Sequence, residues 1–152
     1  MQSAIISDAS CLILLDKIGE LNILRRLFGT VLTTTEIAIE YGNTLPDWVI
    51  VKETSNKTYQ AIIAASVDSG EASAIALAID YDESLLIIDD LKARKFATQL
   101  GLDITGTMGV LIEAKASGVI PAVKPILEKI KRTNFRLSKT LESFVLTAVG
   151  EE

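Results

Sequence analysis

Apolar and polar positions follow one another in blocks that predict strands and helices in turn. One unbroken aliphatic run, residues 85–88, stops at two carboxylates, Asp89 and Asp90, and a helical pattern follows from Leu91. An apolar run without polar alternation is typical of a strand covered on both faces, as parallel strands are. Ligands bind at the carboxyl ends of such strands. The two carboxylates are therefore either helix caps or metal ligands.

The same pattern occurs near the start of the chain, where residues 4–6 are apolar and Asp8 precedes a helical segment. Asp8 is thus an N-cap or a ligand at the end of a strand. Further strands are predicted at 30–33, 48–51 and 103–106, the second of these at a sheet edge. Helices are predicted at 11–18, 21–28, 34–41, 57–67, 72–79, 91–100, 108–117, 121–132 and 138–149. This alternation predicts an α/β fold, a three-layer α/β/α arrangement with a parallel sheet of four or five strands.

Three helix starts carry capping signals that compete with a role in chemistry. Thr33 with Glu36 matches a capping box, and Asp68 with Glu71 matches a second one. Thr107 is positioned to cap the helix that follows the last strand. A capping role is the better interpretation of Glu36, whereas capping and metal binding are equally supported for Glu71 and are compatible.

Five carboxylates fall in or just beyond predicted strand-to-helix junctions: Asp8, Glu40, Glu71, Asp89 and Asp90. In a right-handed βαβ sheet these junctions lie along one edge. Each acid alone has a structural explanation as a cap or as a solvated side chain. Together they would repel and raise one another's pKa unless a cation neutralised them. The pattern therefore predicts a divalent metal, and hard carboxylate oxygens favour Mg²⁺ or Mn²⁺.

Composition limits the classes of function. The chain has 152 residues, of which 49% are apolar and only 5% aromatic, so we expect one domain with an aliphatic core. Histidine is absent, which excludes Ser-His-Asp catalysis, histidine zinc sites and imidazole acid–base pairs. The net charge of −5 argues against a broad basic surface for nucleic acid, but a small acidic site with bound cations is still compatible with it.

The remaining features concern location and the lone thiol. No apolar run approaches the ~20 residues that cross a bilayer, so no membrane partner is expected. The first residues lack the basic region of a secretory signal, and we expect a cytoplasmic protein. Cys11 lies in an apolar segment, where a packed thiol is a better interpretation than a nucleophile.

The order of the motifs resembles that of a PIN domain, of the compact prokaryotic type related to VapC-like toxins. The resemblance rests on Asp8 in ISDAS, Glu40 in IAIEYG, Glu71 in GEASA and Asp90 beside Asp89. The segments GLDITGT, residues 101–107, and GVL, residues 109–111, are similar to the end of the family pattern. The family often has Asp where this chain has Glu71. A single domain over residues 1–152 is implied, with residues 121–152 as a C-terminal helical extension.

The resemblance implies a metal-dependent ribonuclease whose carboxylates hold one or two Mg²⁺ or Mn²⁺ ions at the scissile phosphate. These ions would activate a water for in-line attack. Asp8 and Asp90 are the first choices as ligands, with Asp89 beside them, and Glu40 and Glu71 bind directly or through water. The weaker candidates for contacts to substrate or ligands are Lys92, Arg94, Lys95, Thr105 and Thr107.

Two other functions remain open. A receiver-like signalling domain also binds Mg²⁺ through acids after strands, but the segment around Thr105 lacks the Lys it requires. A PIN-like module that binds nucleic acid or protein without cleaving it is the second alternative. The resemblance further implies RNA and an antitoxin-like protein as partners, and we expect a homodimer. The last helix, with Phe144 and Val145 at helical spacing, closes the core or meets another chain.

Overall fold

A five-stranded parallel sheet forms the centre of the computed structural model, which describes residues 3–152. Its strand order is β3-β2-β1-β4-β5, so β3 is an edge strand, as its sequence predicts. The strands are β1 (Ser3–Ser7), β2 (Val31–Thr33), β3 (Val49–Val51), β4 (Glu83–Ile87) and β5 (Asp103–Thr105). The predicted fold class is therefore confirmed. Residues 1 and 2, which the domain prediction includes, lie outside the described part of the chain.

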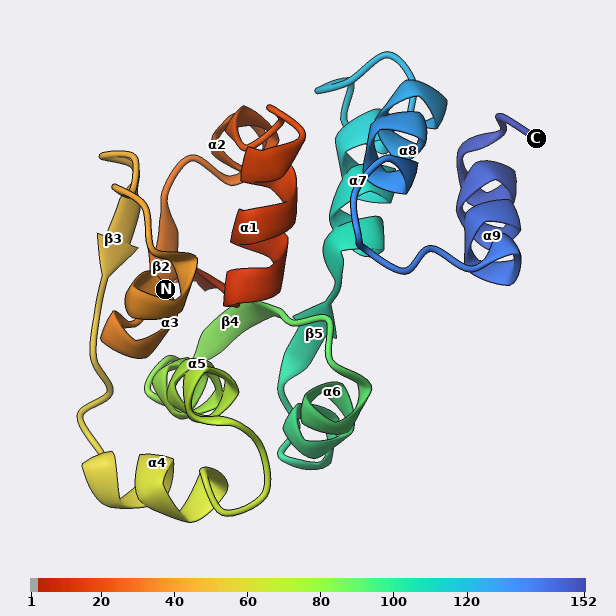
Figure 1. Ribbon diagram of the computed structural model, residues 1–152. Helices are drawn as coiled ribbons and strands as arrows, with labels where there is room; N and C mark the ends of the chain where they lie inside the picture. The colour runs from red at the N-terminus through yellow and green to blue at the C-terminus, as the bar shows by residue number, and fades with distance from the viewer. Residues whose placement is uncertain (1–2) are drawn as a thin grey trace.

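Helices cover both faces of this sheet (Figure 1). Helices α1, α2 and α7 lie above the strands in that view, and α5 and α6 lie below them. Within residues 3–152 the helices are α1 (Ala9–Lys17), α2 (Asn22–Phe28), α3 (Thr35–Tyr41), α4 (Lys57–Ile63), α5 (Ser69–Ile79), α6 (Leu91–Gln99), α7 (Thr107–Ala116), α8 (Lys124–Lys131) and α9 (Lys139–Val149). None of them has the length and apolar character that spanning a membrane requires.

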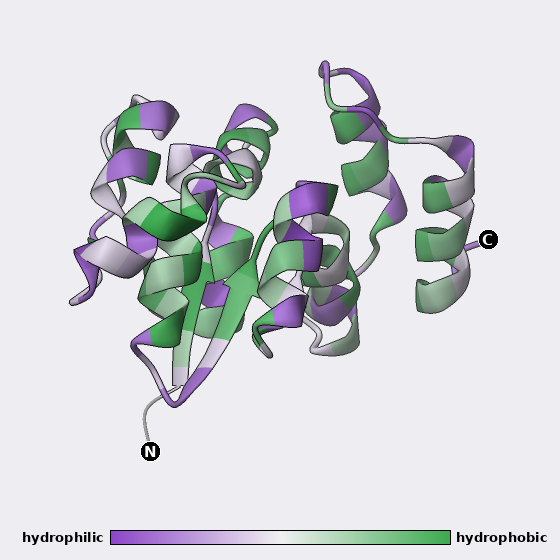
Figure 2. Ribbon diagram, turned by 90° about the horizontal axis from the view of Figure 1, so that it is seen from below, coloured by the Kyte–Doolittle hydropathy of each residue, from purple (hydrophilic) through white to green (hydrophobic). Residues whose placement is uncertain are grey.

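The two central strands explain why the site forms where it does. Ile6 of β1 and Leu86 of β4 are fully buried and pair directly in the sheet. Helix α5 packs on both strands, and its buried small residues, which include Ala72, Ala74 and Ala76, allow close approach on every side of the helix. Figure 2 shows the hydrophobic strand residues at the centre, between the helices. The strand ends are thereby fixed by a core that tolerates little movement.

The order in which strands are added to the sheet reverses at the boundary between β1 and β4. Strands β2 and β3 extend from one side of β1, whereas β4 and β5 extend from the other. In open α/β sheets ligands bind outside the carboxyl ends of the strands at such a switch point. Asp8 follows β1 and Asp89 follows β4, so both acids lie at this position. The order also differs from the 2-1-3-4-5 order of flavodoxin-like folds, which removes the receiver-like alternative.

Several predicted helix caps and helix bounds differ from those in the structure. Thr34, not Thr33, is the N-cap of α3 and accepts a hydrogen bond from the Ile37 amide, so the predicted box with Glu36 does not form. The cap before α7 is Gly106, which makes Thr107 the first residue of the helix. The predicted helix 121–132 begins only at Lys124, and the helix predicted at 57–67 ends at Ile63. The box of Asp68 and Glu71 and the cap at Ser138 are confirmed.

The C-terminal helices join the same core. Leu127 and Ile130 of α8 and Val145 of α9 are fully buried, so α9 contributes to core closure. Helix α9 lies at the outside of the molecule, next to the C-terminus (Figure 1). Phe144 beside Val145 is 64% exposed. The last helix thus closes the core with one face and leaves an aromatic side chain on the surface.

Candidate functional site

Asp8 is the most deeply buried acid at the switch point. It caps α1, and its Oδ1 accepts a hydrogen bond from the Cys11 amide at 2.9 Å. Its Oδ2 accepts one from the Asp89 amide, also at 2.9 Å. Only 4% of the residue is exposed. Burial, with the nearby Asp89 charge as the second cause, raises the pKa of Asp8 to about 7 despite the two amide donors. Both the N-cap and the ligand interpretation are therefore compatible with its position.

Asp89 is held in place by the start of α7. The Thr107 amide donates to its Oδ1 at 2.8 Å, and the Thr107 hydroxyl donates to its Oδ2 at 2.6 Å. A Cβ added to Gly106 would lie 2.8 Å from the same Oδ1, so the glycine leaves room for the carboxylate. Asp89 is half-buried, and its own amide contacts Asp8. Strands β1, β4 and β5 together position these two acids.

Glu71 lies in the first turn of α5 and completes the capping box with Asp68. The Glu71 amide donates to Asp68 Oδ1 at 3.0 Å, and Glu71 Oε1 accepts from the Asp68 amide at 3.4 Å. Burial raises the pKa of Glu71 to about 7, and the charges of Asp68 and Asp90 add to the shift. The Glu71 charge in turn contributes to the raised pKa of Asp8. Glu71 is thus both a cap and a member of an acidic cluster.

Glu40 lies in the last turn of α3, and its Oε1 would be 3.1 Å from a Cβ on Gly70. Burial and the charge of Asp68 raise the pKa of Glu40. The expectation that all five acids fall in or just beyond strand-to-helix junctions is wrong for Glu71, because α5 follows α4, and Glu40 lies at the far end of the helix that follows β2. Tertiary packing of α3 on α5, rather than a strand junction, places them near one another.

Asp90 is exposed and caps α6 by accepting a hydrogen bond from the Ala93 amide at 2.9 Å. Its charge reaches Glu71, because it is among the causes of the raised Glu71 pKa. The cluster therefore has two parts. One is the pair of the buried Asp8 and the half-buried Asp89, and the other is the group of Glu40, Asp68, Glu71 and Asp90. From the sequence, Asp68 was predicted only as a helix cap. Its position three residues before Glu71 was the available signal.

The predicted contacts for substrate differ in their freedom to move. Arg94 Nη1 donates to the Ile88 carbonyl at 2.9 Å, so this side chain is fixed against the chain after β4. Lys92 and Lys95 are exposed on α6. The Thr105 hydroxyl donates to the Gly106 carbonyl at 3.5 Å, and Thr107 contacts Asp89 as described.

A set of buried hydroxyl groups lies under the acids and was not anticipated from the sequence. The Thr33 hydroxyl donates to the Ser7 carbonyl at 3.1 Å and ties β2 to β1. The Thr34 and Ser73 hydroxyls are 2.6 Å apart, and Ser73 also bonds to the Gly70 carbonyl at 2.6 Å. Because buried polar groups need partners, these bonds fix β2 against β1 and the start of α3 against α5.

A family model described as a PIN domain matches residues 4–151 of the chain. The chain belongs to the PIN domain family. A search of the curated proteins and a search of the solved structures each found no match. The PIN domain is generally a nuclease fold that uses divalent metal ions, which agrees with an acidic cluster at the switch point of the sheet.

The acids of this PIN domain suit such an ion by their chemistry. The side chains of the cluster that could bind a metal ion are all carboxylates, and carboxylate oxygens are ligands for Mg²⁺ or Mn²⁺. The raised pKa values of Asp8 and Glu71 mean that ionising them without a cation is unfavourable. Nevertheless, no three His, Cys, Asp or Glu side chains within residues 3–152 already lie in an arrangement that holds a metal ion. Exposed side chains such as Asp90 and Glu40 would have to rotate inward.

Proposed function

We propose that this PIN domain is a ribonuclease that hydrolyses RNA phosphodiester bonds with carboxylate-held Mg²⁺ or Mn²⁺. The proposal rests chiefly on one observation, the contact between Asp8 and Asp89 at the switch point between β1 and β4. Burial in this position makes the negative charge of Asp8 unfavourable unless a cation compensates it. A nuclease site provides a reason to retain such a charge, whereas a simple helix cap does not require burial.

The carboxylates would have different roles in holding the metal ion. Asp8 and Asp89 would form the rigid part of the ligand set, because each is oriented by two hydrogen bonds. Glu71, Asp90 and Glu40 would approach from α5, α6 and α3 and complete the set directly or through water. When bound, the ion would neutralise charge on the phosphate and lower the pKa of the attacking water.

The geometry favours Asp89 over Asp90 as the partner of Asp8. The amide of Asp89 contacts the Asp8 carboxylate, and its side chain is fixed by Thr107. Asp90 is exposed and occupied as the cap of α6. We therefore place Asp89 beside Asp8 and assign Asp90 to the outer part of the site, with Glu71.

An RNA cleavage assay tests this function most directly. The protein should cleave single-stranded RNA with Mn²⁺ or Mg²⁺, and excess chelator should abolish the activity. Asp8→Asn should abolish cleavage. Asp103→Asn, the same change at the amino end of β5 and thus at the other edge of the parallel sheet, should leave cleavage unchanged. Cleavage that survives both the chelator and Asp8→Asn would show that another site or a contaminant is responsible.

The arrangement of the acids also favours a second candidate, a PIN-like module that binds nucleic acid or protein without cleaving it. The favouring observation is that within the described residues the carboxylates do not already form a metal-binding group. This alternative predicts that Mn²⁺ leaves the melting temperature unchanged. The ribonuclease proposal predicts a rise of about 2.7 kcal/mol in stability at a hundredfold excess over Kd.

The biological setting forms the finer part of the proposal. We propose that the protein is cytoplasmic and acts as the toxin of a toxin–antitoxin pair, restrained by an antitoxin-like protein whose basic side chain enters the acidic cluster. Expression should then arrest growth, and Asp90→Asn should relieve the arrest. Harmless high-level expression of the wild type, with no co-purifying chain, would contradict the toxin role.

We also propose a homodimer and a single domain over residues 1–152 with residues 121–152 as its helical extension. The exposed Phe144 of α9 supports a contact with another chain, and the buried side chains of α8 and α9 support a shared core. Sedimentation of the wild type and of Phe144→Ser tests the dimer. A wild-type monomer at all concentrations would contradict it.

A further inference from the structure

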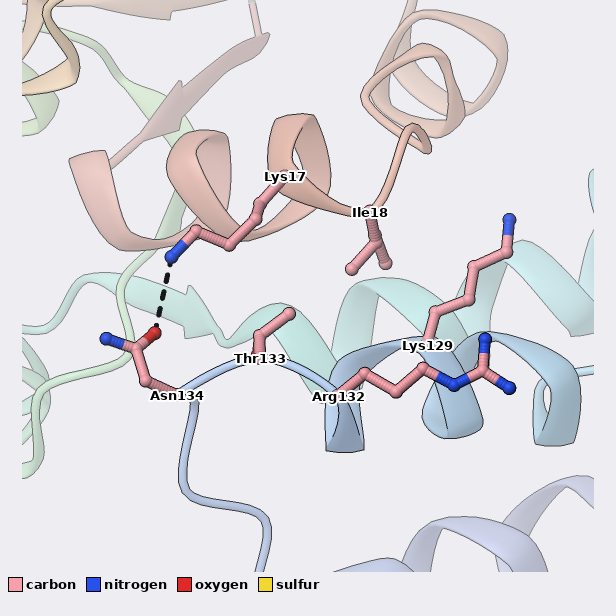
Figure 3. A pocket seen from close by; sticks show the side chains of 6 residues that line it. All are labelled: Lys17, Ile18, Lys129, Arg132, Thr133 and Asn134. Carbon is pink, nitrogen blue, oxygen red and sulfur yellow. Dashed lines mark hydrogen bonds between the residues drawn. The ribbon is translucent and has the colours of Figure 1, made fainter.

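A basic groove runs between α1 and the last turn of α8 with the segment that follows it. Its wider part has a volume of about 530 Å³ and is lined by Lys17, Ile18, Lys129, Arg132, Thr133 and Asn134. Figure 3 shows Lys17, the last residue of α1, and Ile18, which follows it, on one side and residues 129–134 on the other. Three of the six lining side chains are cationic, in a chain whose net charge is −5.

This groove continues along α1 toward its amino end, which Asp8 caps. A second cavity of about 170 Å³ is lined by Ser10, Ile13, Leu14, Lys17, Asn134 and Phe135. The two cavities share Lys17 and Asn134, whose side chains are joined by a hydrogen bond of 3.3 Å. Ser10 lies in the first turn of α1, two residues after Asp8. The groove therefore follows α1 for about 10 Å, from the first turn, which Asp8 caps, to the far end of the helix.

The charges around the groove are segregated from those of the rest of the chain. Residues 121–141 contain six Lys and Arg side chains and one Glu, so this segment is +5, which leaves −10 elsewhere. Lys129 is paired with Glu20 at 2.7 Å. The charged groups of Lys17 and Arg132 have no carboxylate within 4.0 Å among residues 3–152. Two cations of the groove are thus available to an anion.

We infer that this groove binds the phosphate backbone of the single-stranded RNA that flanks the cleavage position. An extended anion with a charge every few ångströms matches a groove with cations at one end and the cleavage site at the other. The choice of RNA rests on the proposed function. An acidic peptide has the same charge, but the direction of the groove, which leads to the acidic cluster, favours a strand that continues into that cluster.

The groove makes no base-specific contact in this scheme. Lys17 and Arg132 would act through charge, and Asn134 through a hydrogen bond to phosphate or sugar. Binding should therefore vary little with sequence and fall steeply with salt. In single strands each phosphate contact contributes about 0.7 to the slope of log K against log salt concentration.

The test is RNA binding in chelator, where cleavage does not interfere. A fluorescein-labelled single-stranded RNA is titrated with the full-length wild type, with Lys17→Gln/Arg132→Gln and with Arg25→Gln/Arg26→Gln over a series of salt concentrations. The last variant removes two exposed charges of α2 and matches the change in net charge. The groove variant should lower the slope by about 1.4 and weaken binding about 25-fold at about 0.1 M salt. The control should keep the slope.

Equal losses in the two double variants, or an unchanged slope in the groove variant, would overturn the inference. A polyglutamate peptide provides a further arm: if its binding depends on Lys17 and Arg132 while RNA binding does not, the groove belongs to an acidic peptide. Melting temperatures of all variants verify folding. RNA binding through the groove without cleavage in Mn²⁺ would refute the nuclease function alone, whereas cleavage that the groove variant Lys17→Gln/Arg132→Gln retains in full would refute the groove alone.

Discussion

Replacing Asp8 with Asn should stabilise the metal-free protein at alkaline pH and lose this effect in acid. The pKa of Asp8 is raised from 3.8 to about 7 in the folded state. The folded state therefore binds more protons than the unfolded state between these values, and stability falls as pH rises through the folded pKa. A shift of this size means that the charged form of Asp8 lowers the stability of the folded state by about 4 kcal/mol near pH 9.

The substitution also removes a favourable contact. Asp8 accepts two amide hydrogen bonds, and Asn can accept only one of them through its carbonyl oxygen. The lost bond to a charged acceptor costs about 1.5–3 kcal/mol. The net effect near pH 9 is a stabilisation of about 1–3 kcal/mol, which raises the melting temperature by roughly 2–12 °C in a domain of this size. Near pH 5 the stabilisation gained by removing the buried charge falls to about 2 kcal/mol. The net change in stability caused by Asp8→Asn should then be close to zero or a destabilisation.

Thermal unfolding in chelator, from about pH 5 to about pH 9, measures this crossover. Asp103→Asn is the control, since Asp103 is exposed at the amino end of β5. The change that Asp8→Asn causes is compared with that of this exposed carboxylate at each pH. A destabilisation by Asp8→Asn that is equally large at both ends of the pH range would refute the reasoning, because it would mean that the hydrogen bonds outweigh the buried charge.

Three further predictions concern the support of the acids. Thr107→Val removes the hydroxyl that donates to Asp89 at 2.6 Å, so it should destabilise the protein by about 1.5–3 kcal/mol in denaturant unfolding, and Thr107→Ser should restore most of the loss. Gly106→Ala should reduce metal-dependent cleavage more than stability. The added Cβ would lie 2.8 Å from both Asp89 Oδ1 and Arg94 Nη1, whereas the extended backbone of residue 106 accepts an alanine without strain. An unchanged cleavage rate would contradict this prediction. Asp89→Asn should abolish the Mn²⁺-induced rise in melting temperature, and Asp90→Asn should only reduce it; the reverse order would return Asp90 to the inner position.

The sequence predicted the fold because its signals are local. Aliphatic runs such as residues 85–88 and helix-ending glycines mark elements with little dependence on the rest of the chain. The order of the acids along the chain was visible for the same reason, and Asp8 and Asp89 follow neighbouring strands. Those two acids meet because their strands pair in register, Ser7 opposite Ile87.

Other parts of the site could not be predicted, because they depend on tertiary packing. Glu40 approaches Gly70 only because α3 packs on α5, and no spacing in the sequence encodes that contact. Thr107 was expected to cap α7, but Asp89 lies within reach of its hydroxyl, and a charged acceptor forms the stronger hydrogen bond. The groove beside α1 depends on Lys17 meeting Asn134, which lies 117 residues away along the chain.

The two ends of α1 link the acidic cluster to the basic groove, and this affects how variants at either end are interpreted. The negative charge of Asp8 at the amino end and the positive charge of Lys17 in the last turn both interact favourably with the helix dipole. Each charge therefore stabilises α1 whether or not the residue also binds a ligand. Such contributions amount to about 0.3–1 kcal/mol at exposed positions and fall with salt. Lys17→Gln can therefore lower stability and RNA affinity together, and only a change in the salt slope of binding, measured on fully folded protein, separates the phosphate contact from the helix. For Asp8 the corresponding separation is the sign of the pH dependence, since the dipole favours the charged carboxylate while burial opposes it.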